Sequence, residues 1–323
     1  MAHSMSESNE DGVSYLDDAH EKFGMLLYEQ GYFKQAETLK NKVLDTRKRI
    51  LGVEHPETIR AIAKLASTYR KLGKYMEAEK LEMQVLGARN RILRVDHPDT
   101  IHAMGNLAAT CFKLGKYTEA EKLEMQVLDA RNRILGMEHP YTINAMENLA
   151  ATYRNLEKYT EAERLEMEVL DARNRILGMD HPDTIRAMEN LASTYGNLGK
   201  YTEAEKLEMQ VLDARNRTLG LEHPHTITTM RNLAEKYKCL GKHSEGEELQ
   251  IQAQKAQSRV FPGEHSYEIN TMSNVKEAQE SQVLDARSTV PEEDASDSIQ
   301  VILDPQALAV LPDTIVNHGE KSM

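Results

Sequence analysis

The chain has 323 residues, a formal net charge of −12 at pH 7, 40% hydrophobic residues and no tryptophan. The acidic charge argues against a nucleic-acid partner, because phosphate binding needs an excess of lysine and arginine. No apolar run approaches the ~20 residues that span a bilayer, and the N-terminus has no signal-peptide pattern. The two cysteines, Cys111 and Cys239, form no CxxC motif, which fits a reducing compartment. We therefore expect a cytoplasmic protein with no membrane or nucleic-acid partner.

A unit of 42 residues repeats along most of the chain, after a polar stretch at 1–13 that we expect to be disordered. Its clearest mark is a His-Pro pair, and the five pairs begin at His55, His97, His139, His181 and His223. Residues 14–54 form a more divergent first copy without this pair. The sequence therefore predicts six copies over 14–264.

The sequence pattern of each copy predicts two helices. The first begins at the His-Pro, because proline is well tolerated in the first turn of a helix. Apolar residues then follow at helical spacing, as in Ile185, Met188 and Leu191, up to a glycine such as Gly199. Glycine can take the left-handed geometry that ends a helix. The His-Pro histidine is therefore interpreted as a loop or cap residue.

The second helix opens with the sequence YTEAE, in which Thr202 and Glu205 have the spacing of a capping box. Its apolar stripe includes Ala204 and Val211, and the other carboxylates of the unit are expected on solvated helix faces. No copy has the alternating pattern of a strand. The prediction is an all-α solenoid of stacked helical hairpins.

After residue 264 the pattern decays. Residues 265–287 keep only the start and the end of a copy, which predicts a capping helix. Residues 288–323 are predicted to be an acidic, mostly disordered tail. Within it, the acidic run before Ile299–Ile302 resembles a SUMO-interacting motif, and chance similarity is the alternative.

The unit NLAxTYxxLGKYxEAExL resembles the tetratricopeptide repeat, and its 42-residue period with HPDTI resembles the kinesin light chain type. Similar arrays occur in fungal NTPase-linked receptors. The resemblance implies a right-handed α-solenoid, the tetratricopeptide-like superhelix, that binds a peptide in a concave groove lined by the first helices. The chain shows neither a heptad coiled coil for a motor chain nor a G-x-x-x-x-G-K-[ST] motif. We expect to carry over only the peptide binding of the repeats.

No constellation in the sequence predicts catalysis, a metal site or a cofactor. Successive His-Pro histidines should lie ~15–20 Å apart in stacked repeats, too far for one metal ion. No nucleophile is paired with a base. We therefore expect a non-enzymatic protein without cofactors.

The copies differ mainly along one stripe of the first helix, where a ligand of the groove would lie. The second copy is the most basic there, and four asparagines recur on the stripe. The asparagines are expected either to hold a peptide main chain or to form a hydrogen-bond ladder between repeats. The predicted partner-binding residues are Arg60, Lys64, Arg70, Lys71, Asn106, Lys113, Asn148, Arg154, Asn190 and Asn232.

This basic stripe on an acidic protein predicts a scaffold or adaptor that binds an acidic segment of a protein partner. The alternatives are a regulatory or inhibitory subunit that clamps an enzyme, and the sensor array of a larger receptor. Pairing of the basic side chains with acids of the preceding copy is the simpler explanation of the stripe. Reversal of Lys64 and Arg70 to glutamate is expected to weaken binding while leaving thermal stability nearly unchanged.

Overall fold

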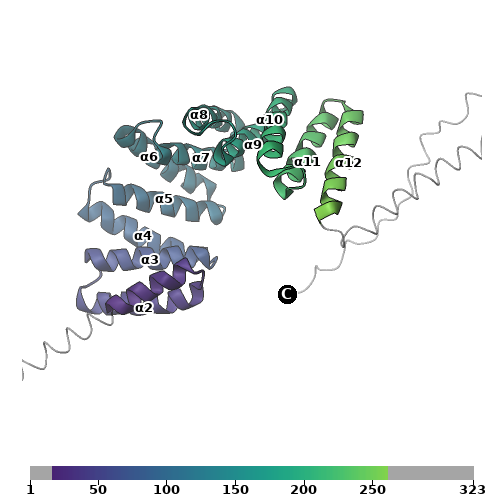
Figure 1. The fold of residues 1–323 in the computed structure, drawn as a ribbon. Coiled ribbons are helices and arrows are strands. Elements are labelled where there is room, and N and C mark those ends of the chain that lie inside the picture. The colour runs from purple at the N-terminus through teal and green to yellow at the C-terminus, as the bar shows by residue number, and fades with distance from the viewer. Residues whose placement is uncertain (1–16, 261–323) are drawn as a thin grey trace, which may run out of the picture. The chain divides into compact units, whose positions relative to one another are not determined.

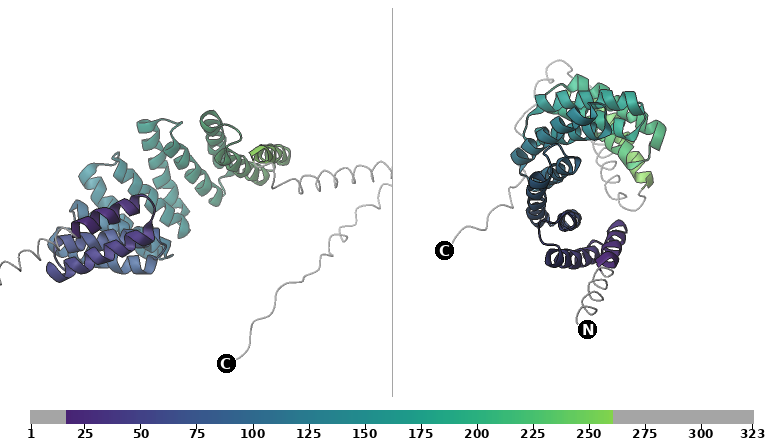
Figure 2. Two further views of the ribbon diagram at one scale, coloured as in Figure 1. Left: turned by 60° about the horizontal axis from the view of Figure 1, so that its bottom comes forward. Right: turned by 90° about the vertical axis from the view of Figure 1, so that its left-hand side faces the viewer.

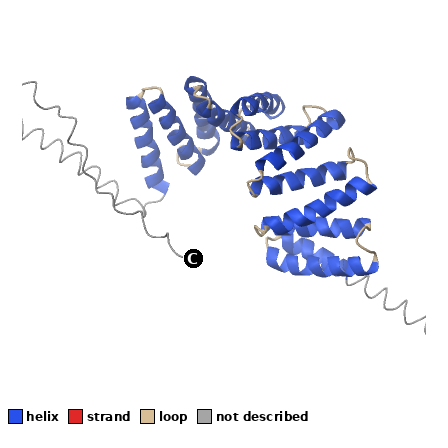
Figure 3. Cartoon of the chain, turned by 180° about the vertical axis from the view of Figure 1, so that it is seen from behind, coloured by secondary structure: helices blue, strands red, loops and turns tan. Residues whose placement is uncertain are grey.

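The computed structural model describes residues 17–260. The predicted disordered N-terminus, the capping helix at 265–287, the acidic tail and the Ile299–Ile302 contact lie outside these residues. In the described part, hairpins of helices follow one another without a strand (Figure 1, Figure 3). The predicted all-α solenoid of stacked helical hairpins is confirmed.

The first hairpin consists of helical residues 17–29 and α2 (Phe33–Ile50). The other five hairpins are α3 (Pro56–Lys71) with α4 (Tyr75–Ile92), α5 (Pro98–Lys113) with α6 (Tyr117–Leu135), α7 (Pro140–Asn155) with α8 (Tyr159–Leu177), α9 (Pro182–Asn197) with α10 (Tyr201–Leu219), and α11 (Pro224–Cys239) with α12 (His243–Val260). Within this array the first helices α7 and α9 lie toward the inside of the bend, and the second helices α8 and α10 lie toward its outside (Figure 1, Figure 2).

The core is a chain of clusters, and each one joins a repeat to the next. In one cluster, Met146 and Leu149 of α7 pack with Val169 of α8 and with Ala187 of α9. Each Å² of apolar surface that is buried contributes ~25 cal/mol to stability. This burial therefore stabilises the interfaces between repeats as well as each hairpin.

The His-Pro histidines cap the first helices. Each is in an extended conformation before the helix, and its Nδ1 accepts a hydrogen bond from the backbone N–H two residues later. At His181, the donor is Asp183 at 3.1 Å. The interpretation of these histidines as cap residues is confirmed.

The capping box predicted for the second helices is wrong. The N-cap residue is the lysine before the tyrosine, as in Lys158 and Lys200, and no side chain caps the helix. The threonine is already the second helical residue, so its hydroxyl is past the capping position. The glutamate of the box contacts the next copy instead, as Glu163 does with Lys200 at 2.6 Å. This residue therefore joins repeats rather than capping its helix.

The turn between the two helices requires left-handed backbone geometry. Gly115 and Gly199 have φ of 74° and 72° there, but the fourth copy has Glu157 with φ of 58°. A residue with a Cβ is strained in this geometry by ~1–2 kcal/mol, whereas glycine is not.

Glu157→Gly is therefore expected to raise the free energy of unfolding by about 1 kcal/mol, because Glu157 is exposed and only strain is removed. Urea denaturation would measure the change. Gly199→Ala is the control and should lower stability. A destabilising Glu157→Gly would contradict the argument.

Candidate functional site

The predicted basic residues of the second copy lie on α3, but three of them already have acidic partners. Lys64 Nζ lies 2.5 Å from Glu21, and Arg60 pairs with Glu57. Arg70 Nε lies 3.2 Å from Glu82, whose side chain is 5% exposed. Pairing with an acid of the preceding copy, the simpler explanation, therefore holds for Lys64.

This geometry corrects the expected effect of reversing Lys64 and Arg70. Glutamates there would lie beside Glu21 and the buried Glu82, so the reversal would lower stability. Lys71 and Lys113 are exposed and have no acidic partner among the described residues. They are the better test positions on the predicted stripe.

The remaining predicted residues are not gathered in one place. Arg154 Nη1 lies 3.1 Å from Glu166 and donates to the backbone oxygen of Asn190 at 3.4 Å. Asn148 and Asn232 are exposed, and no ladder of asparagines joins the repeats in residues 17–260. Asn106 differs, because its Oδ1 accepts a hydrogen bond from Arg70 at 3.2 Å. The peptide-holding role of the asparagines remains a prediction.

A feature that sequence reasoning missed is the arginine near the end of the second helix in each of the first five copies. In the fourth copy, Arg173 makes two hydrogen bonds of 2.8 Å to the two carboxylate oxygens of Glu147. In the fifth copy, Arg215 holds Glu189 in the same way, at 2.5 and 2.6 Å. Each pair clamps a second helix onto the first helix of its own copy.

The second and third copies keep the arginine but lack the glutamate. The residues in its place are Ala63 and Gly105. Arg89 and Arg131 donate to backbone oxygens of the following copy, at 2.6 and 2.8 Å, and form no ion pair within the described residues. A side chain at residue 105 would begin 3.9 Å from Arg131 Nη2. The position that a glutamate side chain fills in the fourth and fifth copies is therefore empty beside the guanidinium of Arg131.

These arginines gather around His102 of α5. Burial lowers the pKa of His102, and the positive charges of Arg89, Arg70 and Arg131 lower it further. Asn106 Nδ2 lies 3.4 Å from His102 Nδ1 and links it to Arg70. We call Arg70, Arg89, Arg131, His102 and Asn106 the arginine cluster. Guanidinium groups of this kind bind carboxylates through two parallel hydrogen bonds.

The sequence contained a signal for the arginine cluster. The arginine is constant from the first copy to the fifth, while its partner position changes from Glu21 to Ala63 and Gly105 and back to Glu147. Comparison of copies flagged the change as a varied position on the groove stripe. It could not show that the varied position faces a constant one on another helix.

The second helices also bury glutamates, which contradicts the expectation that these carboxylates lie on solvated faces. Glu82, Glu124, Glu166 and Glu208 are 3–6% exposed. Burial raises the pKa of Glu82, Glu124 and Glu208 to about 7 and also raises that of Glu166. The side chains lie at the joint between copies, closed to solvent. They affect stability rather than forming an open reactive site.

The described residues contain no group of three or more histidine, cysteine, aspartate or glutamate side chains that could hold a metal ion. They also contain no helix with the length and apolar character of a membrane span.

Comparisons with known proteins agree with this architecture. A tetratricopeptide repeat model matches residues 15–91, 62–133, 99–175, 141–217 and 183–257. One similar crystal structure is that of nearly identical TPR-like repeats of a kinesin light chain protein from Podosopora anserina. Its sequence is 30% identical to this chain, and the TM-score is 0.60 over 65% of this chain and 100% of that chain. None of the curated proteins compared with the chain matches it.

Two more distant structures share the fold. BtubC (BKLC) from P. vanneervenii is 20% identical, with a TM-score of 0.58 over 71% of this chain and 92% of that one. The apo form of RapI is 12% identical, with a TM-score of 0.54 over 76% of this chain and 99% of that one. Arrays of this type are generally non-catalytic scaffolds for protein–protein interaction.

Proposed function

Because the chain belongs to the tetratricopeptide repeat family, we propose that it is a non-catalytic scaffold or adaptor that binds an acidic segment of a partner protein at the arginine cluster. The observation that carries the proposal is that Arg89 and Arg131 lack the glutamates that their equivalents hold in neighbouring copies.

The fourth and fifth copies provide a template for the bound state. There, Glu147 binds Arg173 and Glu189 binds Arg215, each through both carboxylate oxygens. A carboxylate of the partner that enters beside Gly105 would make the same contacts with Arg131. A second one beside Ala63 would reach Arg89. The segment is thus expected to carry two carboxylates and to run across adjacent repeats.

The surroundings of the cluster support the same charge preference. Lys71 and Lys113 are exposed on the first helices of these two copies. The whole chain has a net charge of −12 and therefore repels acidic partners in general. A local positive site attracts an acidic segment to one place on this surface. Asn148, Asn190 and Asn232 are proposed to hold the main chain of the segment along the later repeats.

The test is to restore the missing glutamate. Gly105→Glu should place a carboxylate on Arg131, as Glu147 does on Arg173, and so occupy the site from within. We expect binding of a fluorescein-labelled peptide with two glutamates to weaken at least tenfold, about 1.4 kcal/mol. Fluorescence anisotropy with peptides of varied glutamate spacing would measure it. Rising salt should also weaken the wild-type complex.

Gly105→Gln is the matched control, because it has nearly the same size without the charge. It should bind the peptide better than Gly105→Glu does. A peptide with glutamines in place of glutamates should not bind. Equal affinity of Gly105→Glu and the wild-type protein would show that the arginine cluster is not the binding site.

A further inference from the structure

The outer face formed by the second helices has an exposed apolar side chain in every copy from the second to the sixth. Met83, Met125, Met167 and Met209 are each 50–51% exposed, and Ile251 follows at 47%. A single exposed apolar residue is ordinary on a protein surface. A regular row is different, because it continues over several copies and lies away from the first-helix face discussed above.

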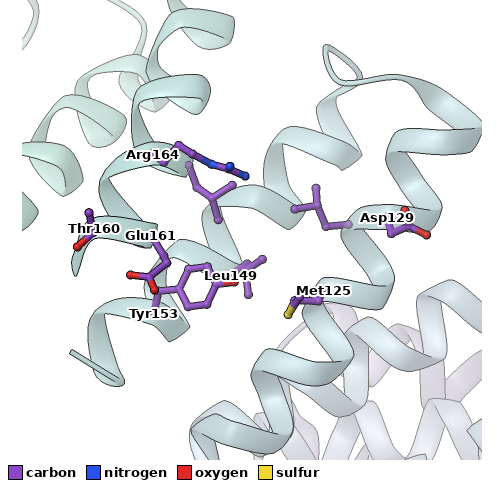
Figure 4. Close-up of a pocket in the computed structure, with 9 residues that line it drawn as sticks. Met125, Asp129, Leu149, Tyr153, Thr160, Glu161 and Arg164 are labelled. Carbon is purple, nitrogen blue, oxygen red and sulfur yellow. The ribbon is translucent and has the colours of Figure 1, made fainter. Parts of the chain in front are cut away.

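Two grooves lie along this row, at equivalent positions two copies apart. The central groove, about 590 Å³, lies between α6 and α8. Figure 4 shows Met125 and Asp129 of α6 across from Glu161 and Arg164 of α8, with Tyr153 of α7 between them. The C-terminal groove, about 440 Å³, lies between α10 and α12. Their equivalent lining shows that the hollow is a product of the repeat itself.

The two grooves differ in charge at one equivalent position, which is Arg164 in the central groove and Glu248 in the C-terminal groove. As a result, the charged residues that line the C-terminal groove are all acidic: Asp213, Glu245 and Glu248. Asp213 pairs with Arg217, whereas Glu245 and Glu248 form no ion pair within the described residues. Gln252 donates a hydrogen bond to Glu248 at 3.3 Å, and the charge of Glu245 acts on Lys242. The C-terminal groove therefore combines an apolar floor with two carboxylates on its α12 side that have no ion-pair partner in residues 17–260.

We propose that the C-terminal groove, between α10 and α12, docks a basic amphipathic helix of a partner protein. Met209 and Leu221, which are 50% and 52% exposed, would receive its apolar side chains above the buried Met230 and Leu233. Glu245 and Glu248 would face its lysines or arginines. From Met209 to Asn216 the wall on α10 is ~10 Å long, which suits a helix of a few turns. Methionine side chains adapt to differently shaped apolar partners.

Charge decides between this occupant and a second copy of the chain. The chain has a net charge of −12, so a second copy would bring further negative charge to an acidic groove. A basic helix is attracted to it. The site is also separate from the arginine cluster of the second and third copies, which is proposed to bind a segment of the opposite charge.

The probe is a short designed helix with leucines on one face, lysines along both flanks and one tryptophan among the leucines. The chain has no tryptophan, so the fluorescence shift on binding comes from the probe alone. Glu248→Arg gives the C-terminal groove the charge of the central groove and should weaken binding at least tenfold. Met209→Ser should also weaken it. Glu247→Arg is the matched control, because Glu247 is exposed on α12 outside the groove lining, and it should change binding less than twofold.

The reciprocal variant Arg164→Glu should create a second binding site in the central groove, so that two probes bind each chain. Absence of binding at millimolar probe concentration would overturn the proposal. So would equal losses from Glu248→Arg and Glu247→Arg, which would indicate non-specific attraction to an acidic protein. If the chain instead self-associates and Met209→Ser makes it monomeric, the occupant is a second copy and the basic helix is wrong. Gly105→Glu should leave probe binding unchanged, so this test and that of the arginine cluster can fail separately.

Discussion

Glu124→Gln is expected to raise the free energy of unfolding by about 2 to 3 kcal/mol at about pH 8 and to have little effect at about pH 4. Glu124 is 6% exposed, and its Oε2 has no hydrogen-bond partner within residues 17–260. Burial, helped by the nearby charge of Glu121 and partly opposed by Thr152, raises its pKa from 4.5 to about 7. Glutamine keeps the shape and can never carry the charge.

The direction of the pH effect follows from where the proton is held. Below pH 4.5 the carboxyl is protonated in both the folded and the unfolded chain, so it costs the fold nothing as a charge. Between pH 4.5 and about 7 the unfolded chain releases the proton while the folded chain keeps it, so rising pH favours unfolding. Above about pH 7 the penalty is constant. The gain from glutamine should therefore grow over this interval and then level off.

Glu82→Gln is the matched comparison, because Glu82 has the same position in the second copy and a pKa also raised to about 7. It differs in its neighbour: Arg70 lies 3.2 Å away, whereas the equivalent residue beside Glu124 is Phe112. Removing the charge of Glu82 leaves Arg70 without its acid, so the gain should be smaller. Thermal unfolding across the pH range would measure both. An equal gain in the two variants would contradict the role given to Arg70.

The helices could be predicted from the sequence because apolar periodicity and burial decide them. Ile185, Met188 and Leu191 recur at helical spacing and are all buried. The His-Pro start was equally readable, because a proline and a capping side chain act within one turn of the chain. Features that depend on local chemistry repeated in every copy were therefore within reach of the sequence.

Features that depend on contacts between helices were not. The capping box failed because its threonine lies inside the helix, and its glutamate turned out to contact the next copy. Glu124 was placed on a solvated face because a carboxylate is seldom buried, but the stacking of α7 on α6 closes it off. Arg89 and Arg131 of the arginine cluster were missed for the same reason, although Arg70 and Asn106 had been predicted. Whether Arg131 is paired or available depends on which residue of the first helix lies opposite it. The residue pattern of a single helix does not show which side chains of two different helices meet.

Arg173→Met is expected to lower the free energy of unfolding by about 3 kcal/mol, within the range of ~3–5 kcal/mol for breaking a buried ion pair. The side chain of Arg173 is 8% exposed and bridges Glu147 of α7 and Asp183 of α9, at 2.8 and 3.0 Å. Without it, the one remaining cation that contacts Glu147 in the described part of the chain is the exposed Arg186, at 3.6 Å. The double variant with Glu147→Met should recover much of the loss, because no unpaired carboxylate remains.

Arg131→Met removes the equivalent arginine of the third copy, where Gly105 supplies no carboxylate. It should lower stability by only about 1 kcal/mol, since one hydrogen bond to the Tyr141 backbone oxygen is lost. It should nevertheless weaken binding of the acidic peptide at least tenfold, whereas Arg173→Met should not. Urea denaturation and peptide anisotropy on the same two proteins would separate the effects. The same arginine would then stabilise the repeat where a glutamate faces it and bind a partner where none does; equal stability losses with unchanged binding would refute that division.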